Sequence, residues 1–116
     1  MKPFPMKVRR VAYERANGRC ERCGAVLGDN CGHAHHRLPK RAGGSTRGEI
    51  QTVSNCLIVC DFCHRFIHEG LAKESREKYG WLLPSGCSPA ETKVLYQLTR
   101  WVYLRGDGTV TEIKNG

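Results

Sequence analysis

The chain has 116 residues, of which 19 are Lys or Arg and 11 are Asp or Glu, giving a formal net charge of +8 at pH 7. This length suits one domain, and because no apolar run approaches the roughly eighteen residues that a bilayer requires, the sequence excludes a membrane span. Residues 1–65 carry twelve Lys or Arg against five Asp or Glu, so the positive charge is concentrated there and should attract polyanions.

The first predicted element is a helix from Lys7 to Ala16. Val8, Val11 and Ala12 fall on one side of it, and the pair Asn17-Gly18 ends it. We therefore expect this segment to pack against the rest of the domain through its apolar side.

Two C-x-x-C pairs follow, Cys20 with Cys23 and Cys60 with Cys63, and 36 residues separate the pairs. Each tight turn presents two sulfurs to one corner of a tetrahedron, so the spacing is typical of a structural zinc ion. Disulfides are the alternative, but seven cysteines leave one unpaired and the N-terminus does not have the pattern of a signal peptide. We expect the three other cysteines to be small buried residues: Cys31, Cys56 and Cys87.

The histidines require a second site, because four cysteines fill a tetrahedral zinc ion and leave no open position. His64 and His68 are four residues apart, so on a helix both imidazoles lie on one face and can bind one ion. Asp61 is the predicted N-cap of that helix, and Gly70 is its predicted end.

His35 and His36 lie in a short run that ends before Pro39, which we interpret as a strand. Adjacent strand residues point to opposite faces, so one ion should bind one of the two and leave the other free. His33 lies on the same side of the strand as His35, and a ligand role for it is a minor alternative.

Taken together, these residues resemble the HNH nuclease motif in its four-cysteine, zinc-supported form. The resemblance covers about residues 18 to 70, and it depends on residue order and spacing as well as residue type. The segments that carry it are His35 to Pro39, Gly43-Gly44, Asn55 within Ser54 to Leu57, and Cys60 to His64.

The resemblance implies a ββα-metal fold that grips one divalent ion over a scissile phosphate. It implies that His35, His64 and His68 are ligands of the catalytic metal, and His68 has this role only in the colicin-type members. It further implies that His36 is the general base and that Asn55 braces the motif loop. Imidazole ligands favour Zn²⁺, Ni²⁺ or Mn²⁺ over Mg²⁺, and the expected metal is one of these four.

The expected partner is DNA, whose phosphates the basic face would attract without reading sequence. The candidate phosphate contacts flank the motif: Arg37, Lys40, Arg41 and Arg47. Lys7, Arg9 and Arg10 would also lie along DNA. Small phage proteins of this kind often act beside the terminase, so the resemblance implies terminase as a further partner.

After the motif we expect a short helix from Leu71 to Tyr79 and a brief second one at Ser88 to Glu91, which has the form of a capping box. Trp101 to Leu104 and Thr109 to Ile113 predict a terminal β-hairpin around Arg105 to Gly108.

The predicted architecture is α+β, a single zinc-stabilised ββα-metal (HNH) domain over residues 1–116. It comprises an N-terminal helix (1–17), a core with the zinc knuckles (18–70) and a helical and hairpin extension (71–116). We expect a cytoplasmic DNA endonuclease, monomeric or weakly dimeric, in the host cytoplasm if phage-encoded. Two alternatives remain, an inactive zinc module that only binds nucleic acid and an adaptor that holds a partner protein.

Overall fold

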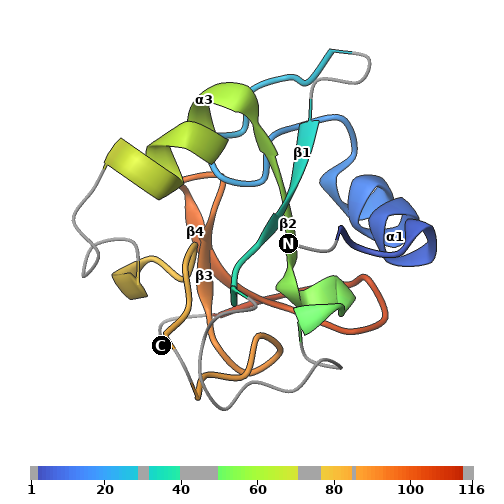
Figure 1. Cartoon of the computed structure of the whole chain (residues 1–116), viewed down its shortest axis with the longest axis vertical. Coiled ribbons are helices and arrows are strands. Elements are labelled where there is room, and N and C mark those ends of the chain that lie inside the picture. Colours follow the sequence, from blue (N-terminus) through green and yellow to red (C-terminus); the bar gives the residue numbers. More distant parts are fainter. Residues whose placement is uncertain (1–2, 29–31, 40–49, 71–76, 85, 114–116) are drawn as a thin grey trace.

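Two antiparallel sheets and their flanking helices give the chain an α+β fold (Figure 1). The computed structural model describes residues 3–28, 32–39, 50–70, 77–84 and 86–113. None of the described helices is long and apolar enough to cross a membrane. The elements in chain order are α1 (Met6–Ala16), β1 (Gly32–His36), η1 (Val53–Asn55), β2 (Cys56–Cys60), α3 (Asp61–Arg65), η2 (Phe66–Gly70), β3 (Val94–Tyr96), β4 (Arg100–Leu104) and β5 (Val110–Glu112).

Helix α1 forms where the sequence predicts it. Asn17 ends it in the left-handed conformation at φ 52°, and its N–H donates to the Tyr13 carbonyl. Ala12 and Ala16 are buried, and they pack with Phe4 and with residues of β2. The small alanines let the helix lie close to the strand.

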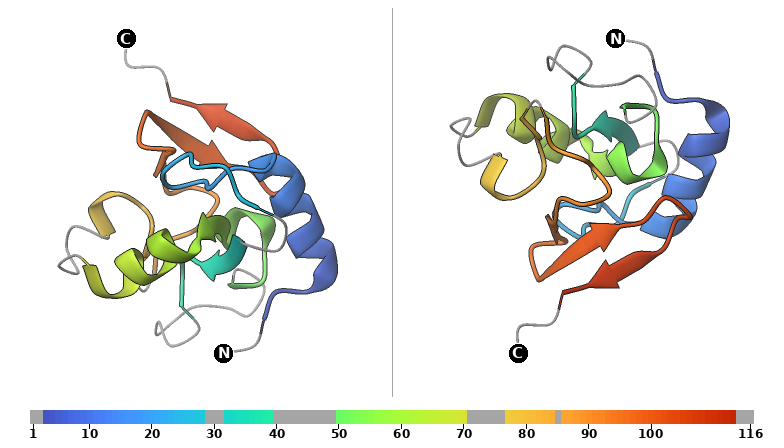
Figure 2. Two further views of the ribbon diagram at one scale, coloured as in Figure 1. Left: turned by 90° about the horizontal axis from the view of Figure 1, so that it is seen from above. Right: turned by 90° about the horizontal axis from the view of Figure 1, so that it is seen from below.

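The centre of the molecule is a strand–strand–helix unit. β1 pairs antiparallel with β2, with Ala34 opposite Ile58 and His35 opposite Leu57, and α3 begins directly after β2. α1 and the α3–η2 helix flank this strand pair on opposite sides (Figure 2). The predicted helix from Asp61 to Gly70 is present, but its second half is a π-helix and its N-cap is Cys60, not Asp61.

The second sheet has the order β3-β4-β5, and β4 with β5 forms the predicted hairpin. Strand β3 was not predicted. The helix expected at Ser88 to Glu91 is wrong, because this segment is a turn in which the Glu91 N–H donates to the Ser88 carbonyl. Of the helix expected from Leu71 to Tyr79, residues 71–76 lie outside the described residues.

The largest core cluster lies between the two sheets and the α3–η2 helix. β2 contributes Leu57 and Val59, the helix contributes Ile67, and β4 contributes Val102 and Leu104, all 0% exposed. Burying five such side chains supplies much of the driving force for folding, at about 1.5–3 kcal/mol each. The cluster therefore fixes the helix relative to both sheets.

A buried ion pair ties this core to α1. Arg15 donates two hydrogen bonds of 2.7 Å to the carboxylate of Glu21, whose side chain is 0% exposed. The Tyr96 hydroxyl (2.7 Å) and the Ile58 N–H (2.9 Å) donate to the same carboxylate. One residue of the first C-x-x-C turn thus joins α1, β2 and β3.

Candidate metal centres

Four cysteine sulfurs form the first centre. Cys20 and Cys23 follow α1, Cys60 ends β2 and Cys63 lies in α3, and their sulfurs all lie within 4.8 Å of one another. The Cys23 and Cys60 sulfurs are 3.9 Å apart. Tetrahedral zinc with bonds of about 2.3 Å places its sulfurs about 3.8 Å apart, so the cluster fits a structural zinc ion.

Backbone N–H groups surround these sulfurs as they would surround thiolates. The Cys20 sulfur accepts from the N–H groups of Cys23 (3.4 Å) and Cys60 (3.3 Å), and the Cys60 sulfur accepts from Cys63 N–H (3.4 Å). Burial raises the pKa of Cys20, but these backbone N–H groups outweigh burial and leave the pKa below its ordinary value. Cys20 therefore favours the deprotonated form that zinc requires, whereas burial raises the pKa of Cys23 and of Cys63.

Three histidines form the second group. His35 comes from β1, His64 from α3 and His68 from η2, and one nitrogen of each lies within 4.8 Å of the others. The rings are turned 71–89° from one another, with centroids 4.8–5.8 Å apart. His36, next to His35 on the strand, is not a member of this group.

His35 has a fixed tautomer. Its Nε2 lies 2.7 Å from the Trp81 carbonyl, which can only accept, so Nε2 carries the proton and Nδ1 keeps its lone pair. Burial lowers the pKa of His35 to about 3, which keeps the imidazole neutral. A second nitrogen held by a carbonyl is the usual support of a metal-binding histidine. Gly80, the residue before Trp81, has φ +78° and lies so close to the Lys93 backbone that no side chain fits there.

His36 lies in a different environment. Its ring stacks on Phe4 with centroids 3.7 Å apart, and its Nε2 is 3.2 Å from the Gln51 side-chain oxygen. An amide oxygen only accepts, so Nε2 donates and Nδ1 is left as the basic nitrogen. Burial lowers the pKa of His36 and outweighs the opposite effect of Gln51. The ring is thus neutral near pH 7, and it is held by Phe4 on one face and by Gln51 at Nε2.

Asn55 braces the chain beside the histidines. It is 0% exposed, its oxygen accepts from the Leu38 N–H (2.6 Å), and its amide donates to the carbonyls of Leu38 (3.1 Å) and Ile50 (2.8 Å). These partners lie on either side of residues 40–49, which are outside the described residues. Asn55 therefore holds the backbone at Leu38 and at Ile50 together.

Arg37 corrects one expectation. It is 0% exposed, so it is not available for a phosphate contact. Its guanidinium instead donates to the carbonyls of Gly80, Ser54, Pro89 and Thr92 at 2.8–2.9 Å. Two of these carbonyls, of Pro89 and Thr92, belong to the turn that replaces the expected helix and to the residue after it. Three further candidates for phosphate contacts lie outside the described residues: Lys40, Arg41 and Arg47.

His33 lies beside the three-histidine group. Its ring stacks on His64 with centroids 4.7 Å apart, and its Nε2 is 3.2 Å from Asp61, which also pairs with Arg65 at 3.4 Å. The minor alternative of a ligand role has no support in the metal-capable group, which does not contain His33. Its contacts instead cover one face of the His64 ring.

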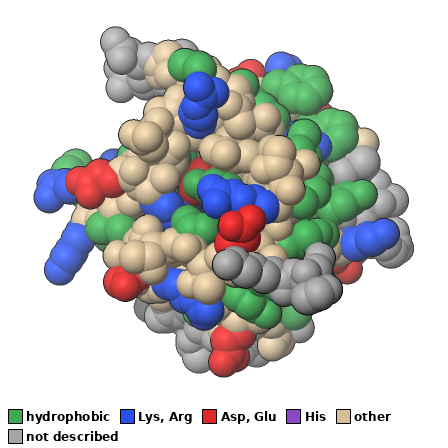
Figure 3. All heavy atoms as spheres, turned by 180° about the vertical axis from the view of Figure 1, so that it is seen from behind, with side chains coloured by type: hydrophobic (Ala, Val, Ile, Leu, Met, Phe, Trp, Pro, Cys, Tyr) green, Lys and Arg blue, Asp and Glu red, His purple; other side chains and the backbone are tan. Residues whose placement is uncertain are grey.

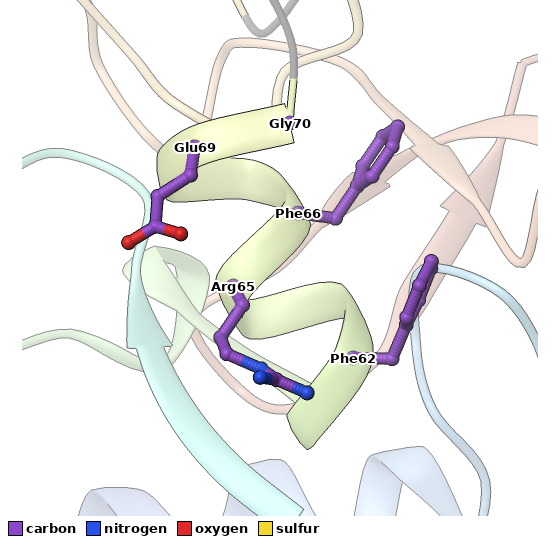
Figure 4. A pocket seen from close by; sticks show the side chains of 5 residues that line it. All are labelled: Phe62, Arg65, Phe66, Glu69 and Gly70. Carbon is purple, nitrogen blue, oxygen red and sulfur yellow. The ribbon is translucent and has the colours of Figure 1, made fainter.

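The α3–η2 helix carries a shallow hollow of about 430 Å³ on its outer side (Figure 4). Phe62 and Phe66 line it together with Arg65, Glu69 and Gly70, and Phe62 is 64% exposed. Neither His64 nor His68 lines this hollow. We therefore place the candidate chemistry at the histidines and not here.

No protein-family model, curated protein or solved structure matches the chain.

Two residues that support the histidines, Trp81 and Gln51, were not predicted from the sequence. Trp81 acts through its backbone carbonyl, 46 residues from His35, so its residue type gives no signal. Gln51 is one of many surface-type polar residues, and only the fold brings it to His36.

Proposed function

We propose that the chain is a metal-dependent endonuclease of the HNH type that hydrolyses DNA phosphodiester bonds. The observation that carries the proposal is the convergence of His35, His64 and His68 from a strand and the helix of one strand–strand–helix unit. Three imidazoles of a tetrahedral or octahedral set leave positions for water and a phosphate oxygen. The four-cysteine cluster leaves none.

The three histidines would hold a divalent ion such as Mn²⁺, Ni²⁺, Mg²⁺ or Zn²⁺. When bound, that ion would stabilise the extra negative charge on the phosphoryl group and on the departing 3′ oxygen. The chain's own residues prepare the site, because Trp81 orients His35 and His33 packs against His64. Both contacts reduce the freedom of ligand rings before any metal binds.

His36 is the proposed general base, which would accept a proton from the attacking water. Its Nδ1 is the acceptor, since Nε2 donates to Gln51. The stack on Phe4 and the bond to Gln51 hold the ring in one orientation. Asn55 supports the adjoining backbone through Leu38.

Electrostatic attraction to DNA is proposed to come from the N-terminal half. Lys7, Arg9 and Arg10 of α1 are all exposed. On the face opposite to that of Figure 1, Lys and Arg side chains are scattered among acidic and apolar ones, and no histidine shows (Figure 3). That face is therefore a poor candidate for the DNA interface.

A cleavage assay on supercoiled plasmid tests the proposal. Wild-type protein should nick or linearise the plasmid with at least one of Mn²⁺, Ni²⁺, Mg²⁺ and Zn²⁺, and EDTA should stop it. His36→Ala should lose at least about a hundredfold in rate, the order expected for a general base. Glu112→Ala is the control, because Glu112 lies exposed on β5 and belongs to neither centre, and it should stay within a few-fold of wild type.

The outcomes separate the three classes of function. If the folded, zinc-containing protein binds plasmid but never cuts it, the chain acting alone is a binding module and not a nuclease. If it neither binds nor cuts DNA at physiological salt, an adaptor role is favoured. Equal losses in His36→Ala and Glu112→Ala would contradict the assignment of the base.

A further inference from the structure

Arg22 follows Glu21 between the two cysteines of the first turn, and it is buried, with only 7% of its surface exposed. Its Nη1 donates to the Cys63 sulfur at 3.2 Å. Its Nε–H is buried and has no hydrogen-bond acceptor among the described residues. A guanidinium at this depth needs compensation, and one sulfur supplies part of it.

Two aromatic rings supply the rest. The guanidinium carbon lies 4.2 Å from the centroid of Phe66 and 4.2 Å from that of Trp81, so the cation is held between them. Cation–π contacts strengthen when the cation is desolvated, as it is here. Arg22 is therefore fixed by three groups, namely a cysteine sulfur and two rings.

Each ring belongs to a segment that supports the three-histidine group. The Trp81 carbonyl accepts from His35, and Phe66 lies on the helix between His64 and His68. A single side chain thus contacts the four-cysteine centre and both supports of the histidines. Arg22 and Trp81 thus connect Cys63 to His35 through direct contacts.

We propose that Arg22 is a positioning residue that couples the two metal centres, so that zinc in the four-cysteine centre raises the divalent-metal affinity of the three-histidine group. Four thiolates around Zn²⁺ carry a net charge of −2, which holds the guanidinium against Cys63. The held cation in turn fixes Phe66 and Trp81, and with them the helix and the carbonyl that orient the ligand rings. The coupling is reciprocal, because each metal must favour the other by the same factor.

The inference rests on the metal-binding part of the proposed function, and a Co²⁺ titration tests it. Protein carrying one zinc per chain is titrated with Co²⁺, and the d–d absorption reports occupancy of the histidines. Arg22→Met keeps most of the side-chain stem but removes the charge and the donor, and it should weaken Co²⁺ binding by about tenfold or more, as outer-shell changes do. Arg22→Lys keeps only the charge and should also bind more weakly.

Arg19→Met is the matched control. Arg19 lies on the same segment, is exposed, and donates to the Gly24 carbonyl, so its loss removes one positive charge without touching Phe66 or Trp81. Its Co²⁺ affinity should stay within about twofold of wild type. Phe66→Leu removes one wall of the sandwich and should weaken binding as Arg22→Met does.

The double variant Arg22→Met/Phe66→Leu separates positioning from general damage. Because both changes act through the same sandwich, the double variant should lose little more affinity than either single variant. Additive losses, or wild-type Co²⁺ affinity in zinc-loaded Arg22→Met, would overturn the coupling. If Arg22→Met fails to retain zinc, the Phe66→Leu variant provides the test instead. Unchanged Co²⁺ affinity in Phe66→Leu would then overturn the coupling. If wild type itself binds no Co²⁺ at the histidines, both the coupling and the proposed metal site fail.

Discussion

The four-cysteine centre and the three-histidine group share one short stretch of chain but differ in kind. Cys60, Cys63, His64 and His68 all lie within β2, α3 and η2. The four cysteine sulfurs lie within 4.8 Å of one another and two of them accept backbone N–H groups, whereas the histidines range from buried His35 to exposed His68.

Under the proposed function, one helix would serve both stability and chemistry. A closed set of four ligands contributes to folding and excludes substrate, and an open set of three admits water and phosphate. The two sets lie on different sides of the helix. Cys63 is buried in the core, while His64 and His68 are not. Removing residues of each centre should therefore affect stability at the cysteines and metal binding at the histidines.

Removal of zinc should have the largest effect. A zinc site of this type binds with about 10–16 kcal/mol, and a small domain has only about 5–15 kcal/mol of stability in total. Chelation, or Cys63→Ser, should therefore unfold the chain at room temperature and abolish metal binding at the histidines as well. Circular dichroism and metal analysis would show this, and a folded metal-free protein would contradict the structural role of the first centre.

Loss of the buried ion pair should come next. Glu21→Gln leaves the Arg15 charge without its carboxylate in the interior, and it should lower the free energy of unfolding by about 3–5 kcal/mol. Tyr96→Phe is the control, because it removes only one donor to Glu21 and should cost about 1 kcal/mol. Denaturant titration of both variants checks the ratio, and equal costs would show that the ion pair is not the main contribution.

Arg37 and Arg9 should separate stability from DNA binding. Arg37→Met leaves four carbonyls without their donor and should cost about 3 kcal/mol of stability, with the salt dependence of DNA binding unchanged. Arg9→Gln, on the exposed side of α1, should change stability by less than about 0.5 kcal/mol and lower the salt slope by about one. A lower salt slope in folded Arg37→Met would contradict the buried role.

His64→Ala should have only a small effect on the stability of the metal-free protein. The side chain is only partly buried, so the free energy of unfolding without added metal should change by about 1 kcal/mol or less. Wild type should gain about 2.7 kcal/mol at a Ni²⁺ concentration one hundred times its dissociation constant, and His64→Ala should lose that gain. Thermal unfolding with and without Ni²⁺ measures both quantities, and an undiminished gain would exclude His64 as a ligand.

The parts of the fold predicted from the sequence are those set by nearby residues. C-x-x-C turns, the Asn17-Gly18 helix end and the β4–β5 hairpin depend on contacts within a few residues, and each forms as expected. The spacing of His64 and His68 likewise placed both on one helix. Strong local signals therefore predicted the frame that carries both centres.

The parts that were missed depend on distant partners. Arg37 was predicted to contact phosphate because it flanks the motif, yet it is buried and its guanidinium donates to carbonyls up to 55 residues away. One of those carbonyls, that of Pro89, lies in the turn that the capping-box pattern had predicted as helix. The contacts of Arg22 were missed for the same reason, since Phe66 and Trp81 meet around it only in the folded chain.

The most direct test of two unlike centres is X-ray absorption on protein loaded first with one Zn²⁺ and then with one Ni²⁺. We predict that the zinc edge shows four sulfur ligands at about 2.3 Å. The nickel edge should show nitrogen and oxygen ligands only, with imidazole scattering that disappears in His64→Ala. Sulfur in the nickel shell, or no nickel bound to the folded zinc protein, would contradict a second, open metal site at the histidines.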